Sequence, residues 1–142
     1  MALETIYTEK WLYDLFAGDD ELFALIGNRF YAYRAPQGTV YPFVVYSFAG
    51  GYDVNTLNQT RVMARLLYTV KVIQRGARDA ITRTAVNRVD ELVGYQRHSV
   101  DAGYVFNSWR EAIVSFDEID ARDSQRYEHI GGIYRIEAWP EG

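Results

Sequence analysis

Residues 61–75 alternate between apolar and mixed side chains, and this alternation constrains the fold more than any other feature of the sequence. A period of two is typical of a β-strand that buries one face. At ~3.3 Å per residue such a strand would span ~50 Å, whereas a compact domain of this size has a radius of gyration of about 14–15 Å. The strand must therefore bend strongly or extend beyond the domain, where a neighbouring subunit would cover it.

Three segments have the apolar spacing of helices. Residues 4–16 repeat apolar side chains every three to four positions, and residues 77–93 form an amphipathic pattern that Gly94 ends. Between them, Asp19 is suited to cap a short helix over residues 19–26, which Gly27 would close. We therefore expect two helical segments at the N-terminus and one longer helix in the second half.

Further strands are predicted at 29–36, 42–48, 103–117 and 126–139. The polar stretch 49–60 and residues 95–102 are interpreted as loops, and the acidic segment FDEIDARDS joins the last two strands. Gly131 and Gly132 indicate a bulge or kink in the final strand. Strands that cluster in sequence favour an α+β fold, a mostly antiparallel twisted sheet with helices packed on it. We expect a single domain over residues 1–142.

The sequence offers no recognisable catalytic or cofactor-binding apparatus. The chain has no cysteine, which excludes disulfides, thiolate zinc sites and cysteine nucleophiles. His98 and His129 lie in different segments without a metal-binding spacing, and the phosphate-binding glycine motifs are missing. Asp117, Glu118, Asp120 and Asp123 do not follow the calcium-loop pattern. We therefore predict no enzyme, no metal and no cofactor. No stretch reaches the ~20 apolar residues of a membrane span, so no membrane partner is expected.

Charge is distributed unevenly along the chain. Residues 1–60 carry a balance of −4, residues 61–97 a balance of +5, and residues 98–142 a balance of −5. A basic segment between acidic ends can pair with a neighbouring subunit or bind nucleic acid. The nucleic-acid alternative rests on the basic residues of 61–88, but the chain as a whole is acidic. The sequence is also rich in Tyr and Arg, which are enriched at protein–protein interfaces.

The order of these patterns resembles the tail terminator (tail completion, minor tail protein U-like) proteins of long-tailed bacteriophages. The resemblance lies in a helical N-terminus leading into ELFALIGNRFYAYRAP (21–36), then YPFVVYSF (41–48), the long strand, the helix, and a final hairpin ending in IYRIEAWP (133–140). It covers nearly the whole chain and contains no invariant catalytic residue.

The resemblance implies a structural virion protein at the head-proximal end of the tail, assembled in the host cytoplasm. Such a protein forms a ring, typically a hexamer, that caps the tail tube, ends tube polymerisation and offers a docking surface to the head-completion or neck proteins. DNA passes through the lumen without specific binding. A head–tail connector or neck protein is the alternative within the same structural class.

Two sets of residues are candidates for these contacts. A head-to-tail ring needs two complementary surfaces on each subunit. The candidate subunit-interface residues are Arg61, Arg65, Tyr68, Lys71, Arg75 and Arg78. A DNA conduit is expected to repel phosphates, and the candidate lumen-facing or tube-facing residues are Asp53, Asp117, Glu118, Asp120 and Asp123.

Overall fold

The structure is a computed structural model that describes residues 3–55, 57, 61–77, 79–94, 96–100 and 104–140. In these residues the chain forms three helices and one six-stranded sheet. The elements, in chain order, are α1 (Leu3–Ala17), α2 (Asp20–Ile26), β1 (Phe30–Ala32), β2 (Phe43–Asn55), β3 (Arg61–Arg75), α3 (Ala80–Val93), β4 (Gln96–Val100), β5 (Tyr104–Ile119) and β6 (Arg126–Pro140).

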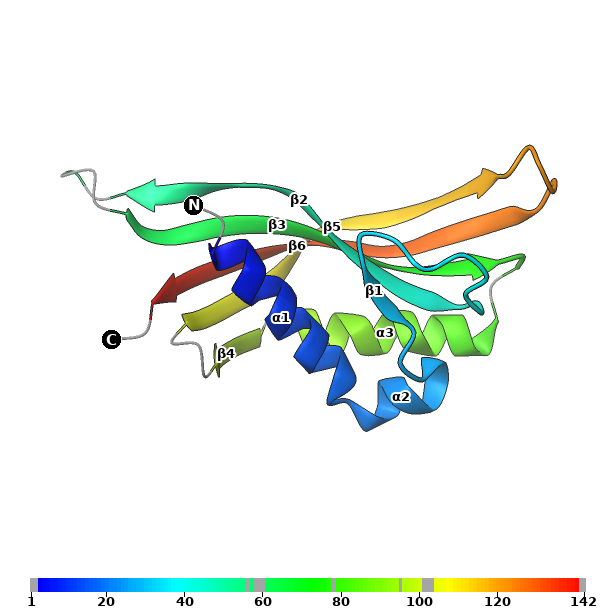
Figure 1. The fold of residues 1–142 in the computed structure, drawn as a ribbon, viewed down its shortest axis with the longest axis horizontal. Coiled ribbons are helices and arrows are strands. Elements are labelled where there is room, and N and C mark those ends of the chain that lie inside the picture. Colours follow the sequence, from blue (N-terminus) through cyan, green and yellow to red (C-terminus); the bar gives the residue numbers. More distant parts are fainter. Residues whose placement is uncertain are drawn as a thin grey trace.

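The sheet has the strand order β1-β2-β3-β6-β5-β4. Only β1 and β2 run parallel, and the other four neighbouring pairs are antiparallel. All three helices lie on one side of the twisted sheet, while the opposite face carries no helix among the described residues (Figure 1). The predicted α+β class with a mostly antiparallel sheet is thus confirmed.

The helices begin and end where local capping chemistry places them. The Asp19 carboxylate accepts a hydrogen bond from the Leu22 N–H at 2.9 Å, and Gly27 ends α2 with a positive φ of 63°. Helix α3 starts at Ala80 rather than at the predicted residue 77, because the Asp79 carboxylate caps it through the Thr82 N–H at 2.7 Å. The helix predictions are otherwise confirmed.

Two predicted loops are wrong. Residues 49–55 continue β2 across its two glycines, with a register shift between Phe48 and Gly50. A Cβ on Gly51 would lie 2.6 Å from the Arg65 carbonyl oxygen, so glycine there lets β3 approach closely. The segment expected as a loop at 95–102 contains β4, which pairs with the beginning of β5. In both places the residues pair with a neighbouring strand, although their local sequence predicted a loop.

The bulge predicted at Gly131 and Gly132 lies in the neighbouring strand instead. The β3–β6 register runs without a shift, whereas β5 shifts between Arg110 and Ala112. The predicted strand at 29–36 is also shorter than expected, since only Phe30–Ala32 pairs with β2.

The core lies between the sheet and the helices, and the alternation in β3 fills its centre. Ala64, Leu66, Tyr68, Val70 and Val72 are all buried, as the period of two predicted. They pack with apolar residues of the other elements, among them Leu12, Phe16, Leu22, Ile26, Phe106, Ala85, Val89, Tyr134 and Ile136. Figure 1 shows that β3 follows the twist of the sheet, so that the β2–β3 pair and the β5–β6 pair reach opposite ends of the molecule.

Two buried tyrosines connect the sheet to the helices. The Tyr68 hydroxyl on β3 donates to the Glu9 carboxylate on α1 at 2.9 Å, and the Tyr134 hydroxyl on β6 donates to Asp90 on α3 at 2.6 Å. Burial is the main cause that raises the pKa of each phenol well above its ordinary value. Both phenols therefore stay protonated and keep their hydrogen bonds at physiological pH.

Candidate assembly surfaces

The basic residues nominated from the sequence do not form one exposed surface. Arg65 forms an ion pair with Glu137 on β6, with Nε and Oε2 at 2.7 Å, and donates to the Tyr52 hydroxyl at 3.4 Å. The Lys71 amine lies 5.3 Å from the centre of the Phe116 ring, and its partial burial lowers its pKa. Arg75 is exposed at the end of β3. Arg65, Lys71 and Arg75 thus share the open face of the sheet, where Arg65 is in an ion pair, Lys71 is partly buried and Arg75 is exposed.

The remaining interface candidates have different outcomes. Tyr68 has no exposed surface, so this candidate is wrong: its ring fills the core and its hydroxyl is bound to Glu9. Arg61 belongs to β3 and pairs with Asn55 through the backbone, but its side chain lies outside the described part. Arg78 lies outside the described residues.

Four of the acidic candidates lie at the end of the β5–β6 hairpin, each beside a partner in the same chain. Asp117 pairs with Arg126 at 2.9 Å, and Glu118 contacts His129 at 2.8 Å. Asp120 and Asp123 belong to the connecting loop, where they bind Arg122 and the Tyr127 hydroxyl, respectively. The Arg122 side chain is the main cause that lowers the Asp120 pKa, and the Gln125 N–H that of Asp123. Asp53 lies elsewhere, exposed on β2 opposite Ala64.

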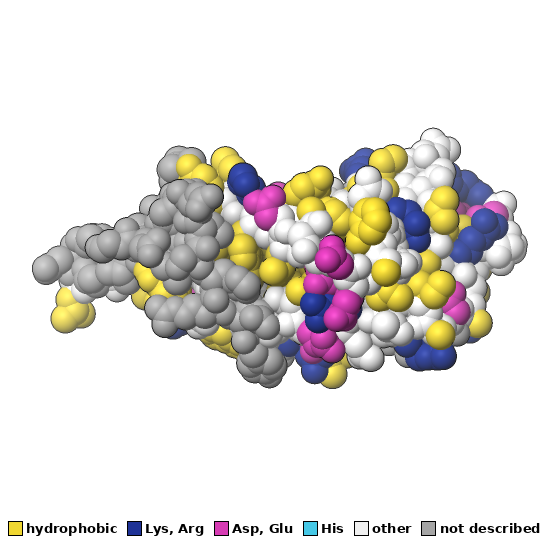
Figure 2. Space-filling model, turned by 90° about the horizontal axis from the view of Figure 1, so that it is seen from below, with side chains coloured by type: hydrophobic (Ala, Val, Ile, Leu, Met, Phe, Trp, Pro, Cys, Tyr) yellow, Lys and Arg dark blue, Asp and Glu magenta, His cyan; other side chains and the backbone are white. Residues whose placement is uncertain are grey.

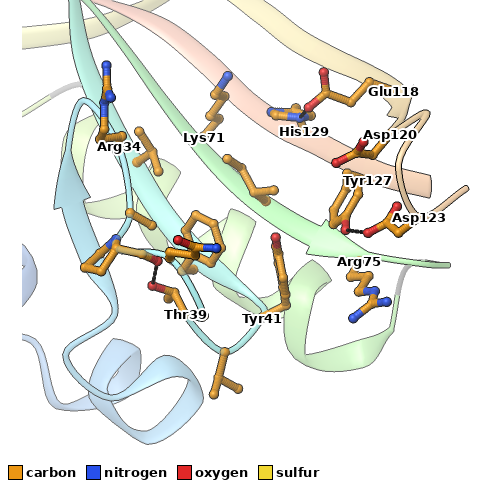
Figure 3. Close-up of a pocket in the computed structure, with 18 of the residues that line it drawn as sticks. Arg34, Thr39, Tyr41, Lys71, Arg75, Glu118, Asp120, Asp123, Tyr127 and His129 are labelled. Carbon is orange, nitrogen blue, oxygen red and sulfur yellow. Dashed lines mark hydrogen bonds and ion pairs between the residues drawn. The ribbon is translucent and has the colours of Figure 1, made fainter. Parts of the chain in front are cut away.

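Members of both sets line one groove of about 1290 Å³ on the open face of the sheet (Figure 3). Lys71 and Arg75 form part of its floor, and Glu118, Asp120 and Asp123 form the wall at the hairpin end. The segment 33–41 supplies the other wall. The strand order brings β3 beside the hairpin that carries the acids, so members of the interface set and of the lumen set lie in the same groove, and their roles stay predictions.

Aromatic rings hold the groove together. Tyr41 comes from the wall segment and lies 5.6 Å from Tyr127 on β6 and 4.9 Å from Phe43 on β2, measured between ring centres. The same wall is attached to the body of the molecule by the Tyr33 hydroxyl, which donates to Glu9 at 3.1 Å. Sequence analysis missed this groove because the 33–41 segment has no pattern beyond a turn at Gln37 and Gly38.

Among the described side chains, His129 is the histidine that lies in the groove. Its ring stacks on Phe116 with centres 4.5 Å apart and planes 9° from parallel, and 6% of the residue is exposed. Nε2 contacts Glu118, while Nδ1 has no hydrogen-bond partner among the described residues. Burial is the largest effect on this imidazole and lowers its pKa below 6.5, with Lys71 adding to it and Glu118 opposing it.

This burial predicts a pH dependence of stability. A depressed histidine pKa means that the folded protein favours the neutral ring, so its contribution is present above pH 6.5 and is lost as pH falls through the lowered folded pKa. Because a single proton is involved, the free energy of unfolding can change by at most about 1.4 kcal/mol per pH unit. Urea unfolding of wild type and His129→Gln between pH 4.5 and 8 should show this slope in wild type only.

The control for this measurement is His98→Gln, which changes the other histidine of the chain. This variant should keep the slope below pH 6.5, because His129 is still present. An identical slope in the His129→Gln variant would show that other groups cause the pH dependence.

Charged side chains of both signs also gather near the middle of the helix-covered face (Figure 2). The Arg88 guanidinium on α3 binds the Asp19 carboxylate at the start of α2 through Nε at 2.9 Å and Nη2 at 2.5 Å. Arg88 Nη1 also lies 2.9 Å from Glu91. The Arg88 bond is the largest of the causes that lower the pKa of Asp19. Arg88, a member of the basic 61–88 region, is therefore neutralised within the chain.

Strands β2 and β5, which we call the two long border strands, lie next to the short edge strands β1 and β4, and much of their outer side pairs with no described strand. On one side β1 pairs only with Val44–Tyr46, and on the other β4 pairs only with Tyr104–Ser108. Within the described residues, no strand pairs with the outer side of β2 from Ser47 to Asn55 or of β5 from Trp109 to Ile119, and the Tyr33 hydroxyl is bonded to the Phe48 backbone. The distribution of charge along the chain does not indicate these edges. The signal available was the presence of apolar side chains on both faces of 112–119.

The described residues contain no group of three or more His, Cys, Asp or Glu side chains that could hold a metal ion. No described helix is long and apolar enough to cross a membrane.

Comparison with known proteins gives a family and a fold. Residues 10–135 match the family model described as tail completion protein gp17. A solved structure, "Virion of native gene transfer agent (GTA) particle", contains a chain that is similar in fold, with a TM-score of 0.61 and 18% sequence identity over 90% of this chain and 91% of that chain. A search of curated proteins finds no match. Because the family model spans most of the sequence, the chain belongs to the tail completion protein gp17 family.

Proposed function

We propose that this tail completion protein forms a ring, of six copies, that caps the tail tube and ends its polymerisation. The ring presents its other side to the head-completion or neck proteins, and DNA crosses its lumen without being bound specifically. The observation that carries the proposal is the family match over residues 10–135. The fold shared with a chain of the gene transfer agent virion is consistent with a role in such a particle.

Several basic side chains of the 61–88 region are already engaged within the chain, which favours a conduit over a nucleic-acid-binding module that would use this region. Binding to phosphates requires available Lys and Arg side chains. Arg65 and Arg88 are instead paired with Glu137 and Asp19, and Lys71 is partly buried over Phe116. The hairpin end carries Asp117, Glu118, Asp120 and Asp123 in a cluster, in which Asp117 and Asp120 form ion pairs with Arg126 and Arg122. We place this cluster toward the lumen or the tube, together with Asp53 on the border strand.

Tube capping tests the proposed function. Tail tube protein from the same particle is polymerised with and without this chain, and tube lengths and ends are measured by electron microscopy. We expect a six-fold ring on one end of each tube. We also expect the mean tube length to stop increasing once this chain is added. Unchanged growth, with no ring at the ends, would overturn the proposal. A ring that binds isolated heads but leaves tube growth unchanged would favour the connector alternative.

The position of the acidic hairpin can be measured in the same preparation. Ala121 is exposed in the loop between Asp120 and Asp123, and the chain has no natural cysteine. Ala121→Cys should react with a bulky maleimide on free protein and become protected on capped tubes. The control is Ile81→Cys on the helix-covered face, at 47% exposure. Full reactivity of Ala121→Cys on capped tubes would place the hairpin on the outer rim.

A further inference from the structure

The segment 33–41, which we call the strap, borders the open face of the sheet with little support along its length. It connects β1 to β2 and forms one wall of the groove. The described hydrogen bonds of residues 35–40 stay inside the strap, where the N–H and the hydroxyl of Thr39 donate to the Pro36 carbonyl. A segment with few bonds to the body of a protein can open while the rest stays folded.

The strap shields apolar side chains on a face of the sheet where no described helix lies. Val44 and Tyr46 of β2 face the core. Phe43 and Val45 alternate with them and therefore point to the open face. Both are nevertheless buried, at 6% and 5% exposure, and both line the groove together with the strap. The Tyr41 ring of the strap lies on Phe43, with ring centres 4.9 Å apart.

The side chain of Tyr33 fastens one end of the strap. Its hydroxyl donates to the Glu9 carboxylate of α1 at 3.1 Å and is also bonded to the Phe48 backbone of β2. The same Glu9 oxygen accepts the hydroxyl of the buried Tyr68 at 2.9 Å, so this carboxylate is fixed to the core. The Tyr33 N–H adds a bond to the Tyr46 carbonyl at 2.8 Å. Tyr33 therefore ties the strap to both α1 and β2.

The backbone of Tyr33 has a conformation that bulky residues rarely adopt. Its φ of 68° lies in the left-handed region, which is uncommon for residues other than glycine. Such a conformation costs free energy and persists where surrounding contacts impose it. Tyr33 is 53% exposed, so these contacts are its hydrogen bonds more than core packing. Loss of the hydroxyl bonds therefore allows the residue to relax and releases this end of the strap.

Ring contacts hold the other end of the strap. The Tyr41 ring lies 5.6 Å from that of Tyr127 on β6, in addition to its contact with Phe43. Figure 3 shows Tyr41 and Tyr127 at the end of the groove near the hairpin loop. Ring contacts tolerate a change of angle better than a hydrogen bond, which weakens steeply when it is bent. The Tyr41 end is therefore suited to act as a pivot and the Tyr33 end as a latch.

We propose that the strap opens as a unit while the sheet and the helices stay folded, with Tyr33 as its latch and Tyr41 as its pivot. In the closed state the open face of the sheet presents a walled groove. In the open state Phe43 and Val45 are uncovered, and the groove becomes an apolar surface on the sheet. Strap opening is a property of the free chain and does not depend on ring formation or tube capping.

Thiol labelling of the folded protein tests the opening, because the wild-type chain contains no cysteine. Val45→Cys places a thiol beneath the strap, and Val70→Cys places one in the core, at a residue with no exposed surface. Valine and cysteine differ little in volume, so both variants should fold. Each is treated with a bulky maleimide at urea concentrations below the unfolding transition. We expect Val45→Cys to react about tenfold faster or more, with little dependence on urea, because local opening exposes little surface.

Tyr33→Phe in the Val45→Cys background tests the latch. This substitution removes the hydroxyl and keeps the ring. We expect labelling of Val45→Cys to become about tenfold faster, which corresponds to a loss of about 1.4 kcal/mol from the closed state. The matched control is Tyr13→Phe on α1, because Tyr13 is 50% exposed and its hydroxyl has no hydrogen bond among the described residues. This control should leave the labelling rate unchanged.

Two results would overturn the proposal. Equal rates and equal urea dependence for Val45→Cys and Val70→Cys would show that the thiol beneath the strap is reached only by global unfolding. A Val45→Cys rate that Tyr33→Phe leaves unchanged would show that the reagent enters the closed groove without release of the latch. Tyr33→Phe also destabilises the folded state relative to the unfolded state, so Val70→Cys should label faster too. The weak urea dependence of Val45→Cys is therefore the result that identifies local opening.

Discussion

Replacing Gly131 with alanine should lower the free energy of unfolding by about 3 kcal/mol or more, a large share of the stability of an ordinary domain. Gly131 pairs with Lys71 of β3 and Val114 of β5 in the middle of the sheet. A Cβ at this position would lie 2.0 Å from the Val70 carbonyl oxygen and 2.6 Å from the Lys71 Cα. Both are backbone atoms, so the clash is relieved only by moving β3 against β6.

The measurement is urea unfolding followed by circular dichroism, with Gly132→Ala as the matched control. The next glycine of the same strand faces the Arg110 Cδ at 2.9 Å and the Ala112 carbonyl oxygen at 3.0 Å. A flexible arginine side chain can shift, and the remaining contact requires a smaller movement. We therefore expect a clearly smaller loss for Gly132→Ala. Equal stabilities for Gly131→Ala and wild type would show that the two strands are not in such close contact.

Replacing Asp19 with alanine should cost about 2–3 kcal/mol of unfolding free energy, because this carboxylate has two structural roles. It caps α2 through the Leu22 N–H, and it receives two bonds from Arg88 of α3. The side chains of Asp19 and Arg88 are 10% and 23% exposed, so water replaces the lost bonds poorly. Arg88 keeps Glu91 as a partner, which limits the loss.

Asp19→Asn separates the two roles. Asparagine caps helices as well as aspartate does but cannot form the ion pair, so it should recover about 1 kcal/mol relative to alanine. The pKa of Asp19 is lowered below 3.8, chiefly by Arg88, so its ionic contribution is present above pH 3.8 and is lost as pH falls through the lowered value. The gap between wild type and Asp19→Asn should therefore narrow at acidic pH. A gap that stays constant to pH 2 would contradict the ion-pair role.

The candidate site could be predicted only in part, and the charged residues show why. Sequence reasoning assigned Arg65, Lys71 and the acids of 117–123 to two surfaces of different sign. In the structure Arg65 pairs with Glu137, and Lys71 lies over Phe116 beside Glu118. These partners are dozens of residues apart in sequence, and their meeting depends on the order of strands in the sheet. Tyr68 is different, because the alternation of 61–75 already indicated that its side chain faces the core.

The sequence by itself determined the features that depend on neighbouring residues. The burial of alternate β3 side chains follows from a period of two, and the start and end of α2 follow from the side chain of Asp19 and the positive φ of Gly27. The tertiary structure decided where strand pairing continues although the local sequence favours strands only weakly, as at residues 49–55 of β2 and in β4. It also decided which borders stay open, because β1 and β4 cover only short parts of β2 and β5. Strand order and register arise from contacts between distant residues, and local sequence patterns carry little information about such contacts.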